Sequence, residues 1–180
     1  VCNYAWQQGI ILVAAAGNNG YGANYPAAFG ESVIAVAAVD ENLEHPDFSN
    51  IYETNDIAAP GVGIVSTYLN ERYATLTGTS MASPHVAGSL ALALSISQKG
   101  SLEDVMKEEA EKLGEPDAFG AGLVRVDRMA EYLAGAARNS HRNYSPLQLL
   151  NNYRRFEKAA DAAVKGFADD AIAEFKRLLS

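Results

Sequence analysis

A serine stands at the centre of the segment GTSMASPHVAG (78–88), where extended chain gives way to a run of small and apolar residues. This change predicts that Ser80 lies at the N-terminus of a helix. There, free backbone N–H groups and the positive end of the helix dipole would stabilise an oxyanion held beside the hydroxyl. Most serines at helix starts are simple N-caps. The motif alone therefore leaves two interpretations, a nucleophile and a cap.

A second group suited to chemistry follows the apolar run IILVAAA (10–16), where Gly17 and Asn18 come directly after a predicted buried strand. Ligands bind at the carboxyl ends of the strands in open α/β sheets. An asparagine amide at that edge can donate a hydrogen bond to charge developing on a substrate carbonyl, and Gly17 lets the backbone come close. Asn-Gly pairs also form left-handed turns, so a turn is the alternative for this segment taken alone.

The strands that must position these groups are predicted from apolar runs bounded by turn residues. Two continuous runs of β-branched residues and alanine predict buried, parallel strands. A shorter strand ends at Pro60-Gly61, and a hairpin-like pair follows it. The predicted strands are 10–16, 32–39 and 55–61, with the pair 64–68 and 72–78.

The helices are predicted between and after these strands. Residues 80–98 are small and apolar throughout, so we expect a helix buried on nearly all sides. Residues 101–113 open with the capping spacing of Ser101 and Asp104. The other predicted helices are the one that ends at residue 8 before Gly9, the one that closes 120–137 after a short strand, and two within 145–180 broken near Gly166. The pattern as a whole is α/β.

Four segments in this order and spacing resemble one family. They are VAAAGNNG (13–20), NYPAA (24–28), AAPGVGIVSTY (58–68) and the serine motif. Together they are similar to the C-terminal half of the catalytic domain of a subtilisin-type serine protease, a subtilase, and within that family to the thermitase-like branch. The resemblance implies the C-terminal portion of a three-layer α/β fold with a mostly parallel sheet, followed here by an α-helical C-terminal extension.

The resemblance also implies roles for single residues. Ser80 matches the nucleophile, and the Asn18 amide matches the oxyanion-hole donor that works with the Ser80 backbone N–H. The implied substrate-binding set is Ala15, Ala16 and Gly17 in one wall of the primary specificity pocket, Asn24 at its base, and Thr79. An apolar wall with an uncharged polar base suits medium or large hydrophobic and aromatic side chains. The implied activity is that of a serine endopeptidase acting on peptide or protein substrates.

The family resemblance implies no cofactor for the chemistry. Asp56 lies where some members hold a weakly bound cation, so the resemblance allows a structural calcium ion there. One carboxylate is thin support, because calcium takes several oxygen ligands and solvated loop carboxylates are common. No residue is assigned as a metal ligand.

The nucleophile needs a base and a group that orients the base. In subtilisins the triad order along the chain is aspartate, histidine, serine, so both partners are expected upstream of this chain. His85 follows Ser80 by five residues, about 140° round a helix, and is expected to be a packed, hydrogen-bonded core residue. His45 is expected to be exposed in an acidic loop. We therefore expect this chain alone to be inactive and to need a partner segment that carries the triad aspartate and histidine.

Two alternatives remain. The first is an α/β-hydrolase-type esterase that uses Ser80, then Asp127 or Asp117, then His141, since these residues occur in the required order. A nucleophile elbow requires glycine at the position that Ala82 occupies. This alternative also gives no role to the segment around Gly17 and Asn18. The second alternative is a non-catalytic subtilase-like fragment that only binds.

Composition excludes several other classes. The 14 basic and 22 acidic residues give a net charge of −8, which argues against nucleic acid as a partner. No apolar run reaches the roughly 18 residues of a membrane span. Cys2 is the single cysteine, so no intrachain disulfide can form. Family resemblance favours an extracellular location.

Charge divides the chain. Residues 1–137 hold 6 basic and 17 acidic side chains, whereas residues 138–180 hold 8 and 5. We therefore predict two regions, the subtilase-like part at 1–137 and a basic helical extension at 138–180.

Overall fold

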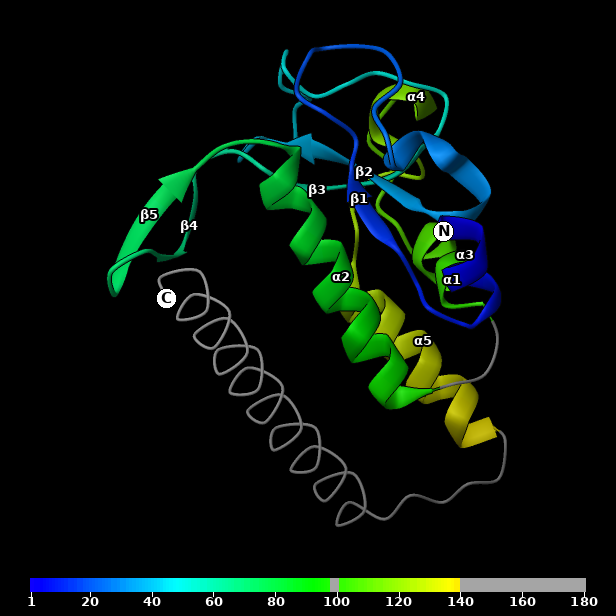
Figure 1. Cartoon of the computed structure of the whole chain (residues 1–180). Helices are drawn as coiled ribbons and strands as arrows, with labels where there is room; N and C mark the ends of the chain where they lie inside the picture. The colour runs from blue at the N-terminus through cyan, green and yellow to red at the C-terminus, as the bar shows by residue number, and fades with distance from the viewer. Residues whose placement is uncertain (98–100, 140–180) are drawn as a thin grey trace, which may run out of the picture. The chain divides into compact units, whose positions relative to one another are not determined.

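A computed structural model describes residues 1–97 and 101–139 (Figure 1). The chain divides into two compact units, Val1–Ala134 and Gly135–Ser180. The first unit contains the sheet and all the residues assigned above to catalysis and substrate binding by resemblance. The boundary after residue 137 stays a prediction, and the helices predicted within 145–180 lie outside the described residues.

A parallel three-stranded sheet forms the centre of the first unit. Its strands are β1 (Val13–Ala15), β2 (Ile34–Val39) and β3 (Asn55–Pro60), and β2 lies in the middle. All six residues of β2 are buried, as expected for a strand of alanine and β-branched residues with protein on both faces. The predicted α/β class with parallel strands is confirmed, although β1 is shorter than the predicted 10–16.

Helices cover both faces of this sheet. On one face, Ile34 and Val36 of β2 pack with Val86 of α2 (Thr79–Ile96). Alternate residues point the other way, so Ala35 packs with Ala27 of the 3-10 helix η1 (Ala27–Ser32). Figure 1 shows α2 running across the sheet from the end where the β4–β5 hairpin leaves.

The hairpin that leads into α2 is antiparallel. Strands β4 (Ile64–Tyr68) and β5 (Arg72–Leu76) pair with Tyr68 opposite Arg72. Asn70 and Glu71 in its turn have φ angles of 59° and 57°, a left-handed conformation that is common in tight hairpin turns. The predicted pair is confirmed, and it forms a sheet separate from the parallel one.

The burial of α2 differs from the prediction. Its buried residues lie on one face: Thr79, Ala82, Val86, Ser89, Leu90 and Ala93. The opposite side is open, and Leu92 and Leu94 are 37% and 42% exposed. The expectation of burial on nearly all sides is therefore wrong for the described residues. Small apolar residues all round this helix would permit close packing everywhere, but the described part of the chain supplies neighbours on one side only.

The remaining helices are short, except the last. They are α1 (Cys2–Gln7), α3 (Leu102–Glu108), α4 (Pro116–Phe119) and α5 (Val126–Asn139). The Ser101 hydroxyl accepts a hydrogen bond from the Asp104 N–H at 3.2 Å, which confirms the predicted cap of α3. That helix ends before the predicted residue 113, and the strand predicted before α5 is reduced to isolated bridges at Leu123. In the described ranges no helix is both long and apolar enough to span a bilayer.

Candidate active site

The first turn of α2 is joined directly to the loop that follows β1. The Asn18 Oδ1 atom accepts hydrogen bonds from the Thr79 backbone N–H and from the Thr79 hydroxyl, both at 2.9 Å. The Thr79 hydroxyl in turn accepts from the Gly17 N–H at 3.2 Å. Because a backbone N–H can only donate, the atom that faces it must be the amide oxygen. The Asn18 Nδ2 donor group is therefore turned away from that N–H.

Ser80 is the second residue of α2 and is exposed, as Asn18 is. Its backbone N–H belongs to the first turn, where N–H groups have no partner within the helix. Gly78 precedes the helix with a φ of 154°, and a Cβ atom there would lie 3.4 Å from Asn18 Nδ2. The structure thus brings the Asn18 amide close to the beginning of α2, and Ser80 is at the helix N-terminus as predicted.

The residues predicted to line a substrate pocket also lie together, at the carboxyl end of β1. Asn24 Nδ2 donates a hydrogen bond to the Ala15 carbonyl oxygen at 3.0 Å. Ala16 is buried and Gly17 has a φ of 111°. A Cβ atom on Gly17 would stand 2.9 Å from Asn24 Cβ and 2.6 Å from Asn50 Nδ2, so this position needs glycine both for its backbone angle and for space.

Asn50 is a neighbour of the site that the sequence analysis missed. Its side chain is buried against the loop of residues 17–22, and its Oδ1 atom accepts from the Asn19 N–H at 2.7 Å. The sequence offers little signal for this contact, because 31 residues separate Asn50 from Asn19. An asparagine between two predicted strands is ordinarily interpreted as a turn residue.

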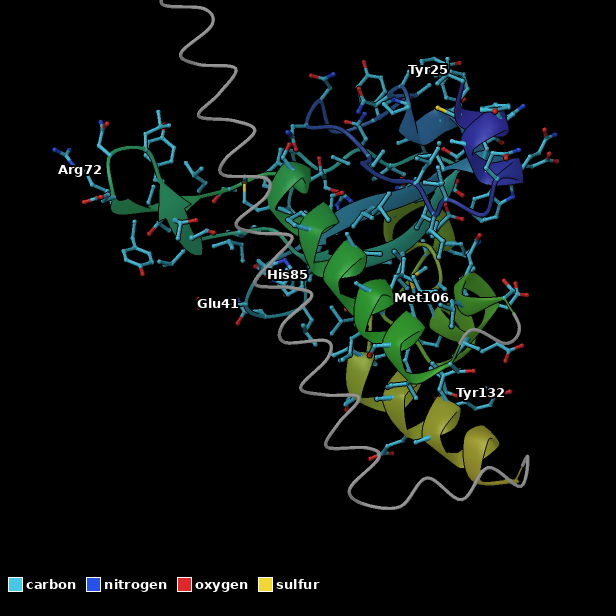
Figure 2. The ribbon with its side chains drawn as sticks, turned by 60° about the horizontal axis from the view of Figure 1, so that its bottom comes forward. Tyr25, Glu41, Arg72, His85, Met106 and Tyr132 are labelled. Carbon is cyan, nitrogen blue, oxygen red and sulfur yellow. The ribbon has the colours of Figure 1, made fainter. Side chains whose placement is uncertain are left out.

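Neither described histidine is placed as expected. His85 is exposed, and its Nδ1 atom lies 2.8 Å from the Met81 carbonyl oxygen, so it is hydrogen-bonded but not packed in the core (Figure 2). His45 is partly buried and meets the Phe119 ring edge-on, with the ring centroids 5.6 Å apart. Burial lowers the pKa of His45, and the negative charge of Asp47 offsets part of this effect by raising it. His141 lies outside the described residues.

Asp127, one of the two acids considered for an α/β-hydrolase, forms an ion pair with Arg125. The Asp127 carboxylate binds the Arg125 guanidinium at 2.9 and 2.6 Å, and these hydrogen bonds lower the pKa of Asp127 to about 2. A nucleophile elbow also joins a strand of the central sheet to a helix. The strand before Ser80 is β5, which belongs to the separate hairpin. The connection before Ser80 therefore does not match a nucleophile elbow, and the α/β-hydrolase alternative loses the support of this connection and of Asp127.

The residues around Asp56 do not fit a calcium ion. The Asp56 Oδ1 atom lies 2.7 Å from Lys107 Nζ, and its Oδ2 atom accepts from the Ala35 N–H at 2.8 Å. Burial lowers the pKa of Lys107, but hydrogen bonds to Asp56 and Glu103 outweigh burial and hold that pKa above its ordinary value. The Lys107 ammonium thus takes one Asp56 oxygen and the Ala35 N–H takes the other, and the described residues contain no cluster of three potential metal ligands.

Comparison with known proteins decides the family. A family model described as the subtilase family matches residues 1–122. The chain belongs to the subtilase family. Subtilisin DY of Bacillus licheniformis is 43% identical to this subtilase over 135 residues, which cover 71% of the chain and 49% of subtilisin DY. Thermitase of Thermoactinomyces vulgaris is 42% identical over 133 residues, which cover 72% of the chain and 47% of thermitase.

A third relative is the thermophilic serine proteinase of Bacillus sp. (strain AK1), 47% identical over 112 residues that cover 62% of the chain and 28% of that protein. The chain thus spans less than half the length of these curated relatives. Subtilisin DY and thermitase match this subtilase at nearly equal identity, so the thermitase-like branch stays a prediction.

Proposed function

We propose that this subtilase chain contributes the nucleophile and the oxyanion hole of a serine endopeptidase. The observation that carries the proposal is the pair of hydrogen bonds from Thr79 to Asn18 Oδ1. These bonds leave Asn18 Nδ2 as a donor beside the start of the helix that carries Ser80. A hydroxyl nucleophile next to a side-chain donor and a helical N–H is the arrangement that acyl transfer requires.

In the proposed reaction the Ser80 Oγ attacks the scissile carbonyl carbon, and its proton passes to a histidine. The carbonyl oxygen becomes an oxyanion, which accepts hydrogen bonds from Asn18 Nδ2 and the Ser80 N–H. Collapse of the tetrahedral intermediate expels the amine, which takes the proton from the histidine, and leaves an acyl group on Ser80. Water then attacks the acyl group by the same steps and releases the acid.

The histidine, and the aspartate that orients it, are proposed to come from residues outside these 180. His85 lies about 140° round the helix from Ser80, and its ring is bound to Met81. We further propose that the parallel sheet is the C-terminal portion of a three-layer subtilisin-like domain completed by that segment.

The substrate is proposed to be a peptide or protein with a hydrophobic or aromatic side chain on the acyl side of the scissile bond. That side chain would lie against Ala15, Ala16 and Gly17, with Asn24 at the base of the pocket. The support for this arrangement is the hydrogen bond from Asn24 to Ala15, which joins the base to the wall.

The test is peptide hydrolysis by this chain produced together with the segment that supplies the histidine and aspartate. The expected result is cleavage after hydrophobic or aromatic residues, abolished by Ser80→Ala and retained by Ser83→Ala on the same helix. Peptide binding without cleavage would favour the non-catalytic alternative. Cleavage by the chain alone that disappears in His141→Ala would favour the hydrolase alternative.

A further inference from the structure

We infer that Asn50 is a positioning residue that holds Asn18 in place for catalysis, an inference that rests on the proposed function. Asn50 lies in the segment between β2 and β3 and is 1% exposed. Both of its side-chain hydrogen bonds go to the loop of residues 17–22, which we call the oxyanion loop. Among the described residues, the buried Asn50 amide bonds this loop alone, so it is suited to fixing the loop's shape.

Asn50 bonds the backbone on both sides of Asn18. Its own N–H donates to the Gly17 carbonyl oxygen at 3.0 Å, and its Oδ1 atom accepts from the Asn19 N–H at 2.7 Å. The Gly17 carbonyl and the Asn19 N–H belong to the two planar peptide units that flank Asn18. Holding both units restricts the φ and ψ angles of Asn18, and with them the direction in which its side chain leaves the backbone.

A third bond spans the oxyanion loop. Asn50 Nδ2 donates to the Gly22 carbonyl oxygen at 2.9 Å. One side chain therefore supplies an acceptor to Asn19 and a donor to Gly22, a combination that an amide offers and a carboxylate does not. Because both partners are backbone groups of known polarity, the orientation of the Asn50 amide is determined.

Asn50 is itself anchored to the parallel sheet. Asn55 Nδ2 in β3 donates to the Asn50 carbonyl oxygen at 2.8 Å. The hydroxyl of the neighbouring Ser49 accepts from the Ala38 N–H of β2 at 3.0 Å. Ser49 and Asn55 are buried like Asn50. The contacts thus run from the rigid sheet through Asn50 to the oxyanion loop.

This support matters because Asn18 is exposed, so packing contributes little to its position. Its side chain is tied to Thr79, and the backbone that carries it is tied to Asn50. A donor to an oxyanion is effective only when it already stands where the charge develops. Loss of the Asn50 amide should therefore slow the chemical step and leave substrate binding nearly intact.

The test is a double-mutant cycle on the assembled enzyme, with Asn50→Ala, Asn18→Ala and both together. We expect Asn50→Ala to lower kcat by roughly tenfold or more, short of the loss of the whole oxyanion donor, with KM changed by less than about twofold. In the Asn18→Ala background the same change should lower kcat by less than about twofold, because its target is gone. Equal effects in both backgrounds would overturn the inference.

The control is Ser89→Ala, which removes a buried hydroxyl that bonds the His85 carbonyl within α2. It should leave kcat within about twofold of the unaltered enzyme, because it removes a buried polar contact without touching the oxyanion loop. If Asn50→Ala fails to fold, Asn50→Ser repeats the cycle with a milder change. A loss of kcat in Ser89→Ala as large as in the Asn50 variants would contradict a specific role.

A second measurement separates failure of this inference from failure of the proposed function. Hydrogen exchange at the Asn19 backbone amide should become at least about tenfold faster in the Asn50 variants, while the Ala38 amide keeps its protection. Unchanged exchange at Asn19 would overturn the inference whether or not the enzyme cleaves peptides. Absence of cleavage together with faster exchange would overturn the proposed function and leave the structural role of Asn50 standing.

Discussion

At the scale of single residues, the site depends on which end of the Asn18 amide faces α2. The backbone N–H of Thr79 decides this, because it can only donate and so selects the amide oxygen. The Thr79 hydroxyl adds a second bond to the same oxygen and accepts from Gly17. Thr79 therefore orients the Asn18 amide, a more specific role than the place in substrate binding that the resemblance implied.

Replacing Asn18 with alanine in the assembled enzyme should lower kcat and leave KM nearly unchanged. The lost donor acts on charge that exists only in the transition state. In subtilisin, a member of the same family, removal of the oxyanion-hole asparagine costs about 10²–10³-fold in kcat, and we expect this range here. Steady-state kinetics on a peptide substrate provide the measurement.

Asn19→Ala is the matched control for that change. Its exposed side chain is removed, but the backbone N–H that bonds Asn50 remains. We expect its kcat to stay within about threefold of the unaltered enzyme. A loss in Asn19→Ala equal to that in Asn18→Ala would mean that the loop, and not the Asn18 amide, is what the chemistry depends on.

At the scale of elements, the segment between β2 and β3 connects the site to the rest of the first unit. Asn50 in its second half bonds the oxyanion loop, and His45 in its first half packs on Phe119 of α4. The His45 Nε2 atom is buried without a hydrogen-bond partner among the described residues. This segment should therefore respond to protonation of that imidazole.

Stability should fall as the solution is acidified below about pH 6.5. Burial holds the pKa of His45 below its ordinary value of 6.5 in the folded state. As the pH falls, the unfolded chain takes up the proton before the folded chain does. The stability that depends on neutral His45 is therefore fully present above pH 6.5 and is lost as the pH falls through the lowered pKa. Thermal midpoints measured between about pH 7.5 and 5 should fall less for His45→Gln than for the unaltered chain.

Asp47→Asn provides the opposite change. The Asp47 carboxylate partly offsets the effect of burial on the pKa of His45. Without that charge the imidazole should resist protonation more strongly, and the midpoint should fall more steeply with acid. Equal slopes for the two variants and the unaltered chain would show that His45 does not control this region.

The ion pair between Lys107 of α3 and Asp56 of β3 should contribute measurably to stability. Lys107→Met leaves the Asp56 carboxylate, whose side chain is 16% exposed, without its cation. Removing one partner of a buried pair costs about 3–5 kcal/mol. Lys107 is 35% exposed, so solvent screening reduces our expectation to roughly 1–3 kcal/mol in the free energy of unfolding. Denaturant titration measures this difference.

Adding Asp56→Asn to Lys107→Met should recover part of that loss, because the uncompensated carboxylate is its main source. Lys112→Met, which removes a surface bond to the Ala121 carbonyl, should cost less than either single change at the pair. A double variant as unstable as the sum of the two single variants would contradict the assignment of the cost to the stranded charge.

Sequence patterns predicted the helices and strands better than they predicted which residues pack against each of them. The buried strand β2 and the hairpin follow from composition and turn residues that act locally. The exposed side of α2 could not be predicted from its sequence, because a helix of small apolar residues does not specify how many neighbours pack against it. The bond between Lys107 and Asp56 joins residues 51 positions apart in sequence, and no local pattern encodes it.

The site itself was predictable only where it coincides with family motifs. Ser80, Asn18 and Asn24 each lie in a segment that resembles the subtilases, and the structure brings Asn18 to the helix start and Asn24 to Ala15. Asn50 and the orientation of the Asn18 amide depend on long-range contacts. The position of His45 depends on α4, which the sequence patterns did not predict.

At the scale of the whole molecule, the chain matches less than half of subtilisin DY or thermitase. In the described residues the proposed nucleophile and donor lie at one end of α2. His85 is hydrogen-bonded to the Met81 carbonyl, and the His45 ring packs against Phe119. We therefore propose that this chain supplies the groups that attack the carbonyl and stabilise its charge. In this proposal, residues outside these 180 carry out the proton transfer.

The most direct measurement is the site of covalent labelling by a fluorophosphonate. Such probes react with a serine that a neighbouring base has activated. The chain assembled with the segment that supplies the histidine and aspartate is treated with the probe, digested and mapped by mass spectrometry. We expect one adduct on Ser80, which disappears when that segment is withheld. An adduct on any other residue, or equal labelling of the chain alone, would contradict the proposal.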